Sequence, residues 1–303
     1  MAGSIYIYSD RPDVAAEIAG WAKAEGKTAI LLAAGSEEAE TLKNAGADKI
    51  LCLNGNGTFI GNYIQAVAEL LQSQEADLLM AASTVRGREF AAGVAGALKC
   101  AMISDIRVAH FEDNVLKTEK MIYGGAVCQY ENTAGFAVVT VPPAVFEKPS
   151  ADGETGIETF EAAADARISL VSAEPIVKNS VDLTKAEKIV SVGLGVKNKE
   201  DLKLAYDLAD AIGAEVGCSR SIADEYKWMD EYIGMTGVTV KPKLYLTIGI
   251  SGQIQHVFGI RDSKIIVAID KNENAPIFRA ADYGIVGDLY EIVPALTEKI
   301  KNM

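Results

Sequence analysis

The residues best suited to chemistry gather in one stretch of the second half of the chain, residues 244–289. An apolar run there enters the glycine turn 249–252, and a short helical segment follows that carries Gln255 and His256. A glycine turn between a strand and a helix N-terminus brings backbone N–H groups together, and such donors bind an anion or a cofactor carbonyl. This pattern predicts a nucleotide-like ligand beside the turn.

Two carboxylates in the same stretch lie at the ends of predicted elements. Asp270 ends the apolar run 264–269, and a carboxylate at a strand end can accept hydrogen bonds from ribose hydroxyls. Asp288 precedes the last predicted helix, where its side chain can cap the helix N-terminus. Asp270 therefore fits a nucleotide site, whereas Asp288 has a structural role on these grounds alone.

Two upstream turns add polar side chains. Ser219 and Arg220 follow the predicted strand 215–217, and by themselves they indicate a surface arginine beside a helix N-terminus. Thr236 and Gly237 belong to a glycine-rich loop with no further local signal. Neither turn specifies a ligand by itself.

A third turn, Gly193-Leu194-Gly195, lies between a predicted strand and a predicted helix, as in a dinucleotide-binding fingerprint. Asn198 occupies the place of the third glycine, so the fingerprint is incomplete and a structural turn is an equal alternative. The sequence also shows no histidine–carboxylate constellation for hydride transfer. These two observations disfavour a nicotinamide-dependent dehydrogenase.

A resemblance to the flavin-binding region of the electron-transfer flavoprotein alpha subunit is carried by the fragments GISGQIQH, DSKIIVAID, APIF and ADYGIVGDL. The N-terminal domain of the same family is similar to AASTVRGREFAAGVAGALKCAMISDI and MIYGGAVC, so the resemblance extends over nearly the whole chain. It implies one FAD held mainly by the C-terminal domain and a beta subunit that contacts the N-terminal domain.

The resemblance also implies which residues contact the flavin ring. Arg220, paired with Ser219, would lie against the isoalloxazine, where a planar and permanent positive charge stabilises the reduced flavin. Thr236, followed by Gly237, would form a hydrogen bond around flavin N5, because a hydroxyl can donate to the oxidised atom or accept from its reduced N–H. We expect Arg220 to be the most important of these contacts.

Further contacts are implied along the rest of the cofactor. Ser251 and Gly252 would place backbone donors at the pyrophosphate or at a flavin pyrimidine oxygen. His256, beside Gln255, would contact flavin O2 or the ribityl chain, and Asp288 would lie near the adenine. On general grounds a lone histidine on a short helix is more often structural.

Three positions depart from the family pattern. Leu194 stands where the family commonly has an arginine, and Met235 stands where it has a glutamine. Asp270 replaces the usual asparagine, which changes the local charge while keeping a hydrogen-bond acceptor. No phosphate contact is therefore expected from Leu194.

The resemblance implies an electron carrier rather than a self-contained enzyme. Electrons would arrive from an acyl-CoA dehydrogenase or a related flavoenzyme and leave to a redox acceptor, and the flavin itself would perform the chemistry. No catalytic acid, base or nucleophile is required of the protein. An electron-bifurcating complex is an open alternative, and a non-redox nucleotide-binding sensor of the same fold class is the competing function.

The bulk composition is that of an ordinary soluble globular protein. A net charge of −13 disfavours nucleic acid or an anionic membrane as partner, because both repel an acidic surface. We see no membrane-spanning apolar run and no export signal, so a cytoplasmic location is expected. The cysteines are widely spaced, which predicts reduced thiols and no metal centre.

The predicted elements define two domains, residues 1–185 and 186–303, each alternating strands and helices. The first is expected to be a Rossmann-like parallel sheet, with Ser36 capping an early helix and with antiparallel additions over residues 109–146 that give a mixed sheet. The second is expected to be a doubly wound, flavodoxin-like FAD-binding domain.

Overall fold

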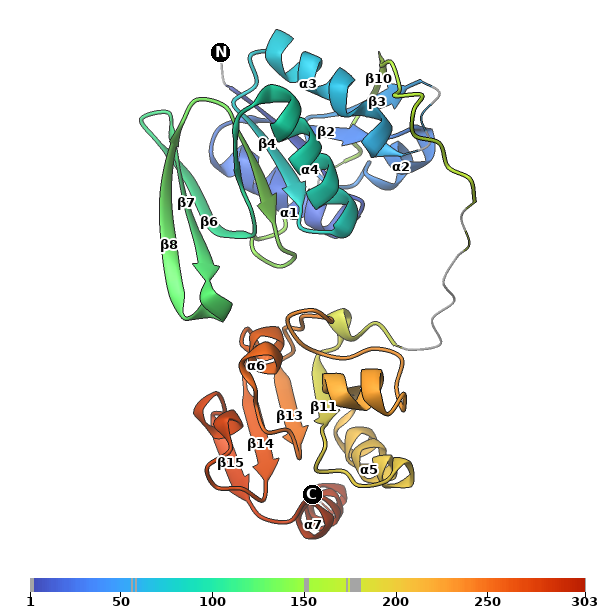
Figure 1. The fold of residues 1–303 in the computed structure, drawn as a ribbon, viewed down its shortest axis with the longest axis vertical. Coiled ribbons are helices and arrows are strands. Elements are labelled where there is room, and N and C mark those ends of the chain that lie inside the picture. Colours follow the sequence, from blue (N-terminus) through green and yellow to red (C-terminus); the bar gives the residue numbers. More distant parts are fainter. Residues whose placement is uncertain are drawn as a thin grey trace. The chain divides into compact units, whose positions relative to one another are not determined.

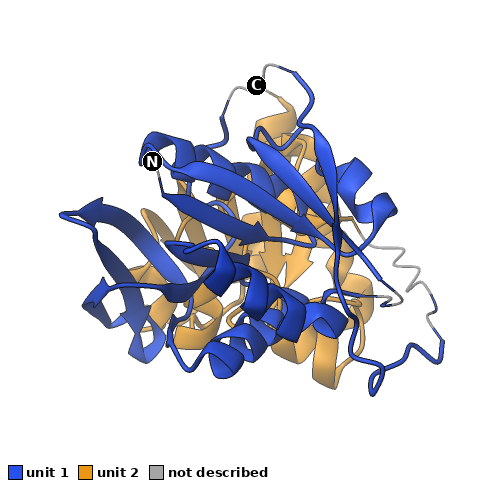
Figure 2. Cartoon of the chain, turned by 90° about the horizontal axis from the view of Figure 1, so that it is seen from above, with its two compact units in different colours: residues 1–174 blue, residues 175–303 orange. Residues whose placement is uncertain are grey.

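The computed structural model describes residues 3–55, 57, 59–149, 153–172, 174 and 181–302. The chain divides into two compact units, Met1–Glu174 and Pro175–Met303, which Figure 2 shows in separate colours. The boundary expected at residues 185 and 186 from the sequence lies within the second of these units, and as a domain limit it stays a prediction.

The first unit is built on a seven-stranded sheet in which every neighbouring pair is parallel. Its spatial order is β10-β3-β2-β1-β4-β9-β5. The strands are β1 (Ser4–Tyr8), β2 (Thr28–Ala33), β3 (Lys49–Asn54), β4 (Leu78–Ala82), β5 (Ala101–Ile103), β9 (Ala137–Val141) and β10 (Ile157–Glu161). The expectation of a Rossmann-like parallel sheet is confirmed.

Helices cover both faces of this sheet, as Figure 1 shows. They are α1 (Pro12–Ala24), α2 (Ser36–Thr41), η1 (Ile60–Tyr63), α3 (Ile64–Ser73) and α4 (Val85–Leu98). Alternate residues of β1 enter opposite cores, with Ile5 packed in the cluster that contains α1 and Tyr6 in the cluster that contains α3 and α4. A sheet buried on both faces explains its continuous apolar strands.

The start of α2 differs from the expectation. Ser36 is the first helical residue rather than the cap, and Gly35 occupies the cap position with a φ of 102°. The carboxylate of Glu38 instead accepts a hydrogen bond from the backbone N–H of Ala34 at 2.6 Å. A glycine takes this left-handed backbone conformation without the steric penalty of a side chain, and this favours Gly35 at the turn.

The predicted antiparallel additions are present as a separate three-stranded sheet of β6 (Ile106–Glu112), β7 (Val115–Ile122) and β8 (Val127–Ala134), with η2 (Tyr123–Gly125) joining the last two. The expectation was wrong for the following segment. β9 pairs in parallel with β4 and β5, so the main sheet is not mixed. All five residues of β9 are buried, as a strand covered on both faces requires.

The second unit contains a five-stranded parallel sheet in the order β12-β11-β13-β14-β15. The strands are β11 (Lys188–Val192), β12 (Glu215–Cys218), β13 (Leu244–Ile248), β14 (Ile266–Asp270) and β15 (Tyr283–Val286). In chain order this is 2-1-3-4-5, the flavodoxin-like order, and the expectation is confirmed. The direction of winding reverses between β11 and β13, and ligands of such folds bind at this switch point.

Helices lie on both faces of this sheet as well. They are η3 (Leu183–Lys185), η4 (Lys199–Asp201), α5 (Leu202–Ile212), the π-helical turn η5 (Ser221–Glu225), α6 (Ile254–Ile260), η6 (Pro276–Arg279) and α7 (Leu289–Lys301). Val190 and Leu246 pack in the cluster that contains α5 and α7, whereas Ile189 and Tyr245 pack in the cluster that contains Ile260 of α6. The unit therefore has its own two-sided core.

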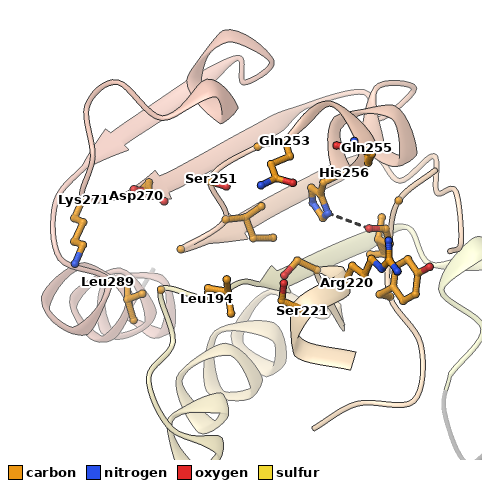
Figure 3. Close-up of a pocket in the computed structure, with 18 of the residues that line it drawn as sticks. Leu194, Arg220, Ser221, Ser251, Gln253, Gln255, His256, Asp270, Lys271 and Leu289 are labelled. Atoms are coloured by element: carbon orange, nitrogen blue, oxygen red, sulfur yellow. Dashed lines mark hydrogen bonds between the residues drawn. The ribbon is translucent and has the colours of Figure 1, made fainter. Parts of the chain in front are cut away.

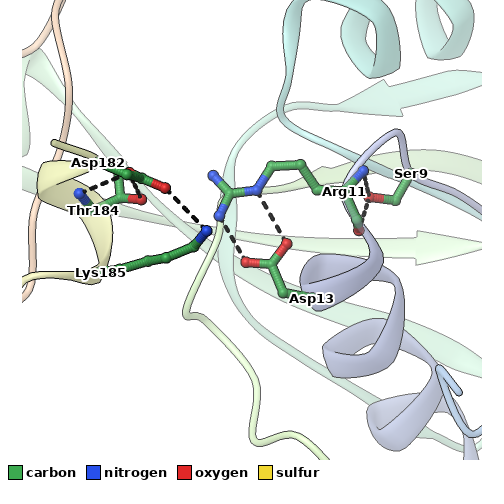
Figure 4. Close-up of polar contacts among 6 residues, drawn as sticks. All are labelled: Ser9, Arg11, Asp13, Asp182, Thr184 and Lys185. Carbon is green, nitrogen blue, oxygen red and sulfur yellow. Dashed lines mark hydrogen bonds and ion pairs between the residues drawn. The ribbon is translucent and has the colours of Figure 1, made fainter. Parts of the chain in front are cut away.

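Polar side chains secure the beginning of an element in each unit. The Arg11 guanidinium pairs with Asp13 at 2.6 Å at the start of α1 (Figure 4). In the second unit, Asp182 accepts a hydrogen bond from the backbone N–H of Thr184 at 3.1 Å and pairs with Lys185, which holds the turn η3 before β11 (Figure 4).

Within the described ranges, no helix is long and apolar enough to cross a membrane.

Candidate functional site

A cavity of about 600 Å³ lies along the carboxyl ends of the strands of the second unit. Its wall is made from the segments that follow β11, β12, β13 and β14, together with the start of α7, so the cavity spans the switch point. Of the residues predicted to bind the cofactor, the cavity is lined by Ser219, Arg220, Thr236, Ser251, Gly252, Gln255, His256, Asp270 and Asp288. The fold thus brings segments that are far apart in the sequence to the same edge of the five-stranded sheet.

Gly237 is the predicted residue that does not line the cavity. A Cβ at this position would lie 2.2 Å from the carbonyl oxygen of Tyr232, so close packing within the loop requires a glycine here. Its assigned contact with the cofactor stays a prediction, while its role in the shape of the loop is evident from the geometry.

The glycine turn after β13 has the backbone conformation that the sequence indicated. Gly249 has a φ of +63° and Gly252 a φ of +81°, both in the region that favours glycine. A Cβ on Gly252 would lie 2.3 Å from the backbone nitrogen of Ile277. The turn also approaches the earlier glycine turn, because the N–H of Gly195 donates to the carbonyl of Gly249 at 3.0 Å. The close backbone packing at Gly195, Gly249 and Gly252 therefore leaves no room for a side chain at these three positions.

His256 is buried, with 7 % of its surface exposed, and both ring nitrogens have partners inside the protein. Nδ1 lies 3.0 Å from the carbonyl oxygen of Ile233, and Nε2 lies 3.1 Å from the hydroxyl of Tyr245. A carbonyl only accepts, so Nδ1 carries the hydrogen and Nε2 accepts from Tyr245. Burial lowers the pKa of His256 to about 4, so the ring is neutral at pH 7.

Arg220 lies at the rim, with 71 % of its side chain exposed. Its Nε donates to Asp224 at 2.9 Å, which orients the guanidinium without burying it. Thr236 lies in the neighbouring loop, and its hydroxyl is 2.9 Å from that of Tyr232. The N–H of Met235 in the same loop donates to the carbonyl of Gln255 at 2.8 Å, so the loop is attached to α6.

Asp270 and Asp288, the two carboxylates that line the cavity, each accept a hydrogen bond from a backbone N–H nearby in the sequence. Asp270 accepts from the backbone N–H of Asn272 at 2.8 Å. Asp288 accepts from the backbone N–H of Tyr290 at 2.9 Å and caps α7, which confirms its predicted structural role. Figure 3 shows Lys271 and Leu289 at the opposite end of the cavity from Arg220.

Sequence reasoning missed several lining residues, including Lys197, Lys271 and Tyr290. The hydroxyl of Tyr290 donates to Asp201 at 2.7 Å and accepts from the N–H of Lys197 at 2.9 Å. This contact joins α7 to the turn after β11 and holds the pKa of Asp201 below its ordinary value. The position of Lys271 directly after Asp270 was a usable local signal, whereas the Tyr290 contact joins residues far apart in the sequence.

The charges that line the cavity and its glycine turn fit FAD. Its lining contains the cations Lys197, Arg220 and Lys271 and the carboxylates Asp270 and Asp288, so positive charge is in excess. That balance suits a dianionic diphosphate, and the glycine turn lets a ligand approach the backbone closely. The departures Leu194 and Met235 also line the cavity, and Leu194 is 55 % exposed.

Fold and site together define a doubly wound α/β protein with a dinucleotide site in its second unit. Residues 15–165 match the family profile of the electron transfer flavoprotein domain, and residues 182–261 match that of the electron transfer flavoprotein FAD-binding domain. The chain belongs to the electron transfer flavoprotein family, as an alpha-type subunit, and its cofactor is FAD.

Full-length relatives agree with this assignment. The chain is 38 % identical over 306 residues to YdiR of Escherichia coli strain K12, which is named provisionally as an electron transfer flavoprotein subunit, with 98 % of each chain covered. It is 37 % identical over 304 residues to the protein FixB of Salmonella typhimurium strain LT2, with 97 % of each covered. FixB of Escherichia coli O157:H7 is 37 % identical over 303 residues, with 97 % of this chain and 96 % of the relative covered.

Proposed function

We propose that this chain is the alpha subunit of a heterodimeric electron carrier that takes electrons from an acyl-CoA dehydrogenase-type flavoenzyme and passes them to a redox acceptor. Support comes chiefly from one observation: Arg220, Thr236, Asp270 and Asp288 line a single cavity at the switch point of the FAD-binding unit. When bound, FAD supplies one- and two-electron redox chemistry.

The placement of the charged residues supports one orientation of the cofactor. Arg220 lies at the end where the flavin ring would bind, and Leu289, the residue after Asp288, lies at the opposite end, where the adenosine would bind. Lys197 and Lys271 would offset the charge of the diphosphate, while Ser251 and the adjacent glycine turn would offer backbone and hydroxyl donors.

The remaining polar residues bind and orient rather than transfer protons. His256 is neutral at pH 7 and has both ring nitrogens engaged, so a direct bond from Nε2 to the flavin would require Tyr245 to release it. Arg220 would raise the flavin potential by placing positive charge beside the reduced ring. These residues would set affinity and potential, while the beta subunit would bind the first unit.

The decisive experiment is co-expression of the chain with a beta-type subunit, followed by visible spectroscopy and flavin counting. We expect a yellow heterodimer that is bleached by dithionite and reduced by an acyl-CoA dehydrogenase with its substrate. One FAD per heterodimer indicates a simple carrier, and two indicate a bifurcating complex. A colourless protein that binds ATP in preference to FAD would overturn the proposal and favour a nucleotide sensor.

A further inference from the structure

A buried tyrosine lies directly behind the flavin end of the cavity. Tyr245 is on β13, its side chain is 0 % exposed, and it does not line the cavity itself. Its hydroxyl lies 3.1 Å from Nε2 of His256, and the two ring centroids are 6.1 Å apart. His256 in turn reaches the carbonyl oxygen of Ile233 from Nδ1, the contact drawn in Figure 3. Three elements are thus joined by two side chains.

The direction of these hydrogen bonds is fixed by their chemistry. The Ile233 carbonyl only accepts, so the imidazole donates from Nδ1 and must accept at Nε2. Burial raises the pKa of Tyr245 far above its ordinary value, so the phenol keeps its proton and donates it. The chain of hydrogen bonds therefore runs one way, from Tyr245 through His256 to the backbone at Ile233.

Ile233 is the first residue of the loop that carries Met235 and Thr236. The N–H of Ile233 donates to the carbonyl of Cys218 at 2.9 Å, which attaches the loop to the end of β12 just before Ser219 and Arg220. The loop also packs closely on α6, because a Cβ on Gly259 would lie 2.7 Å from the Cα of Gly234. His256 of α6 therefore connects Tyr245 of β13 with the start of this loop at Ile233.

We propose that Tyr245 is a positioning residue for the flavin end of the cavity: through His256 it holds the 233–236 loop, and with it Thr236, in place. Without its hydroxyl, Nε2 becomes a buried acceptor with no donor, and the imidazole is free to turn away from Ile233. The adenosine end is held separately by Tyr290 and Asp201. The inference rests on the proposed function for the orientation of FAD.

The first test uses the full-length chain without cofactor. The sequence contains two histidines, so the ring nitrogens of His256 can be assigned by ¹⁵N spectroscopy after comparison with a His110→Gln variant. We expect Nδ1 to be protonated and Nε2 to accept a hydrogen bond. In Tyr245→Phe the Nε2 resonance should move downfield as its donor is lost. An unchanged Nε2 resonance in that variant would overturn the inference.

The second test compares FAD with its two halves, FMN and ADP. Tyr245→Phe should raise the dissociation constants of FAD and FMN about tenfold, corresponding to one buried hydrogen bond, and leave that of ADP unchanged. Tyr63→Phe is the matched control, because Tyr63 is a buried tyrosine of the first unit whose hydroxyl contacts the backbone of Gly57. Equal weakening of FMN and ADP by Tyr245→Phe would contradict a local positioning role.

A double-mutant cycle then tests whether the effect passes through the histidine. His256→Asn keeps a donor near Ile233 but has no Nε2, so Tyr245→Phe should have no further effect on FMN binding in that background. A full effect there would show that Tyr245 acts otherwise and would overturn the inference. If the wild-type chain with its beta subunit bound no FAD, the proposed function would fail, whereas the ¹⁵N test would still decide the role of Tyr245.

Discussion

At the scale of single residues, the charge of the exposed Arg220 should affect the flavin potential more than it affects the affinity for FAD. Arg220→Ala should lower the flavin potential modestly, by about 20 mV, since the positive charge beside the reduced ring is lost but solvent screens it at the rim. Arg88→Ala is the control, because Arg88 is an exposed arginine of the first unit paired with Asp105. Redox titration of both variants is the measurement, and an unchanged potential in Arg220→Ala would remove this role.

His256 should make the stability of the second unit depend on pH. Its pKa is lowered to about 4 in the folded protein, so the unfolded chain takes up the proton first as the pH falls. The neutral form of His256 therefore makes its full contribution to the free energy of unfolding above pH 6.5. This contribution, at most about 3 kcal/mol, is lost as the pH falls from 6.5 to 4. Urea unfolding of the apo chain and of His256→Asn should show a stability difference that shrinks over this range. A difference independent of pH would contradict the assignment.

At the scale of elements, the turn between β13 and α6 should tolerate no side chain at Gly252. Gly252→Ala combines a φ of +81° with a Cβ placed 2.3 Å from the backbone of Ile277, so FAD binding should be lost and stability should fall by more than about 2 kcal/mol. Gly213→Ala is a matched control, because Gly213 has a φ of +63° and open space around it. That variant should lose about 1 kcal/mol and bind FAD normally.

The contact between α7 and the turn after β11 should control the adenosine end. Tyr290→Phe removes the acceptor of the Lys197 N–H and the donor to Asp201, so the dissociation constant of ADP should rise about threefold. The loss is modest because water can replace partners at this partly exposed position. Tyr206→Phe, an exposed tyrosine on α5, should leave ADP binding unchanged in the same calorimetric titration. Equal ADP affinities of Tyr290→Phe and wild type would refute the role of this contact.

Local sequence patterns predicted the type of each element better than they predicted which strands pair. The alternation of apolar runs with helical spacing predicted the order of β11, α5 and β12, and the glycine turn after β13 was predicted to the residue. The parallel pairing of β9 with β4 and β5 was missed. A buried strand has the same apolar pattern in either direction of pairing, and its partners lie far away in the chain.

At the scale of the whole molecule, each unit has its own cores, and no buried cluster mixes residues of the two among those described. Residues 175–303 expressed alone should therefore fold and bind ADP with the affinity of the full chain. Heteronuclear NMR spectra of the fragment, overlaid on those of the full chain, test the fold, and calorimetry tests binding. An unfolded fragment would show that the second unit depends on the first.

The sequence by itself determined the chemistry and the class of the cofactor site, because motifs such as the glycine turn before Gln255 and the carboxylate at Asp270 are local. Tertiary structure alone decided which of these groups meet. The order of the strands brings Arg220 and Asp270 to one cavity, and it places Tyr245 behind His256. Backbone periodicity is a property of neighbouring residues, whereas a hydrogen-bond partner depends on how distant segments pack, and that information appears only in the folded chain.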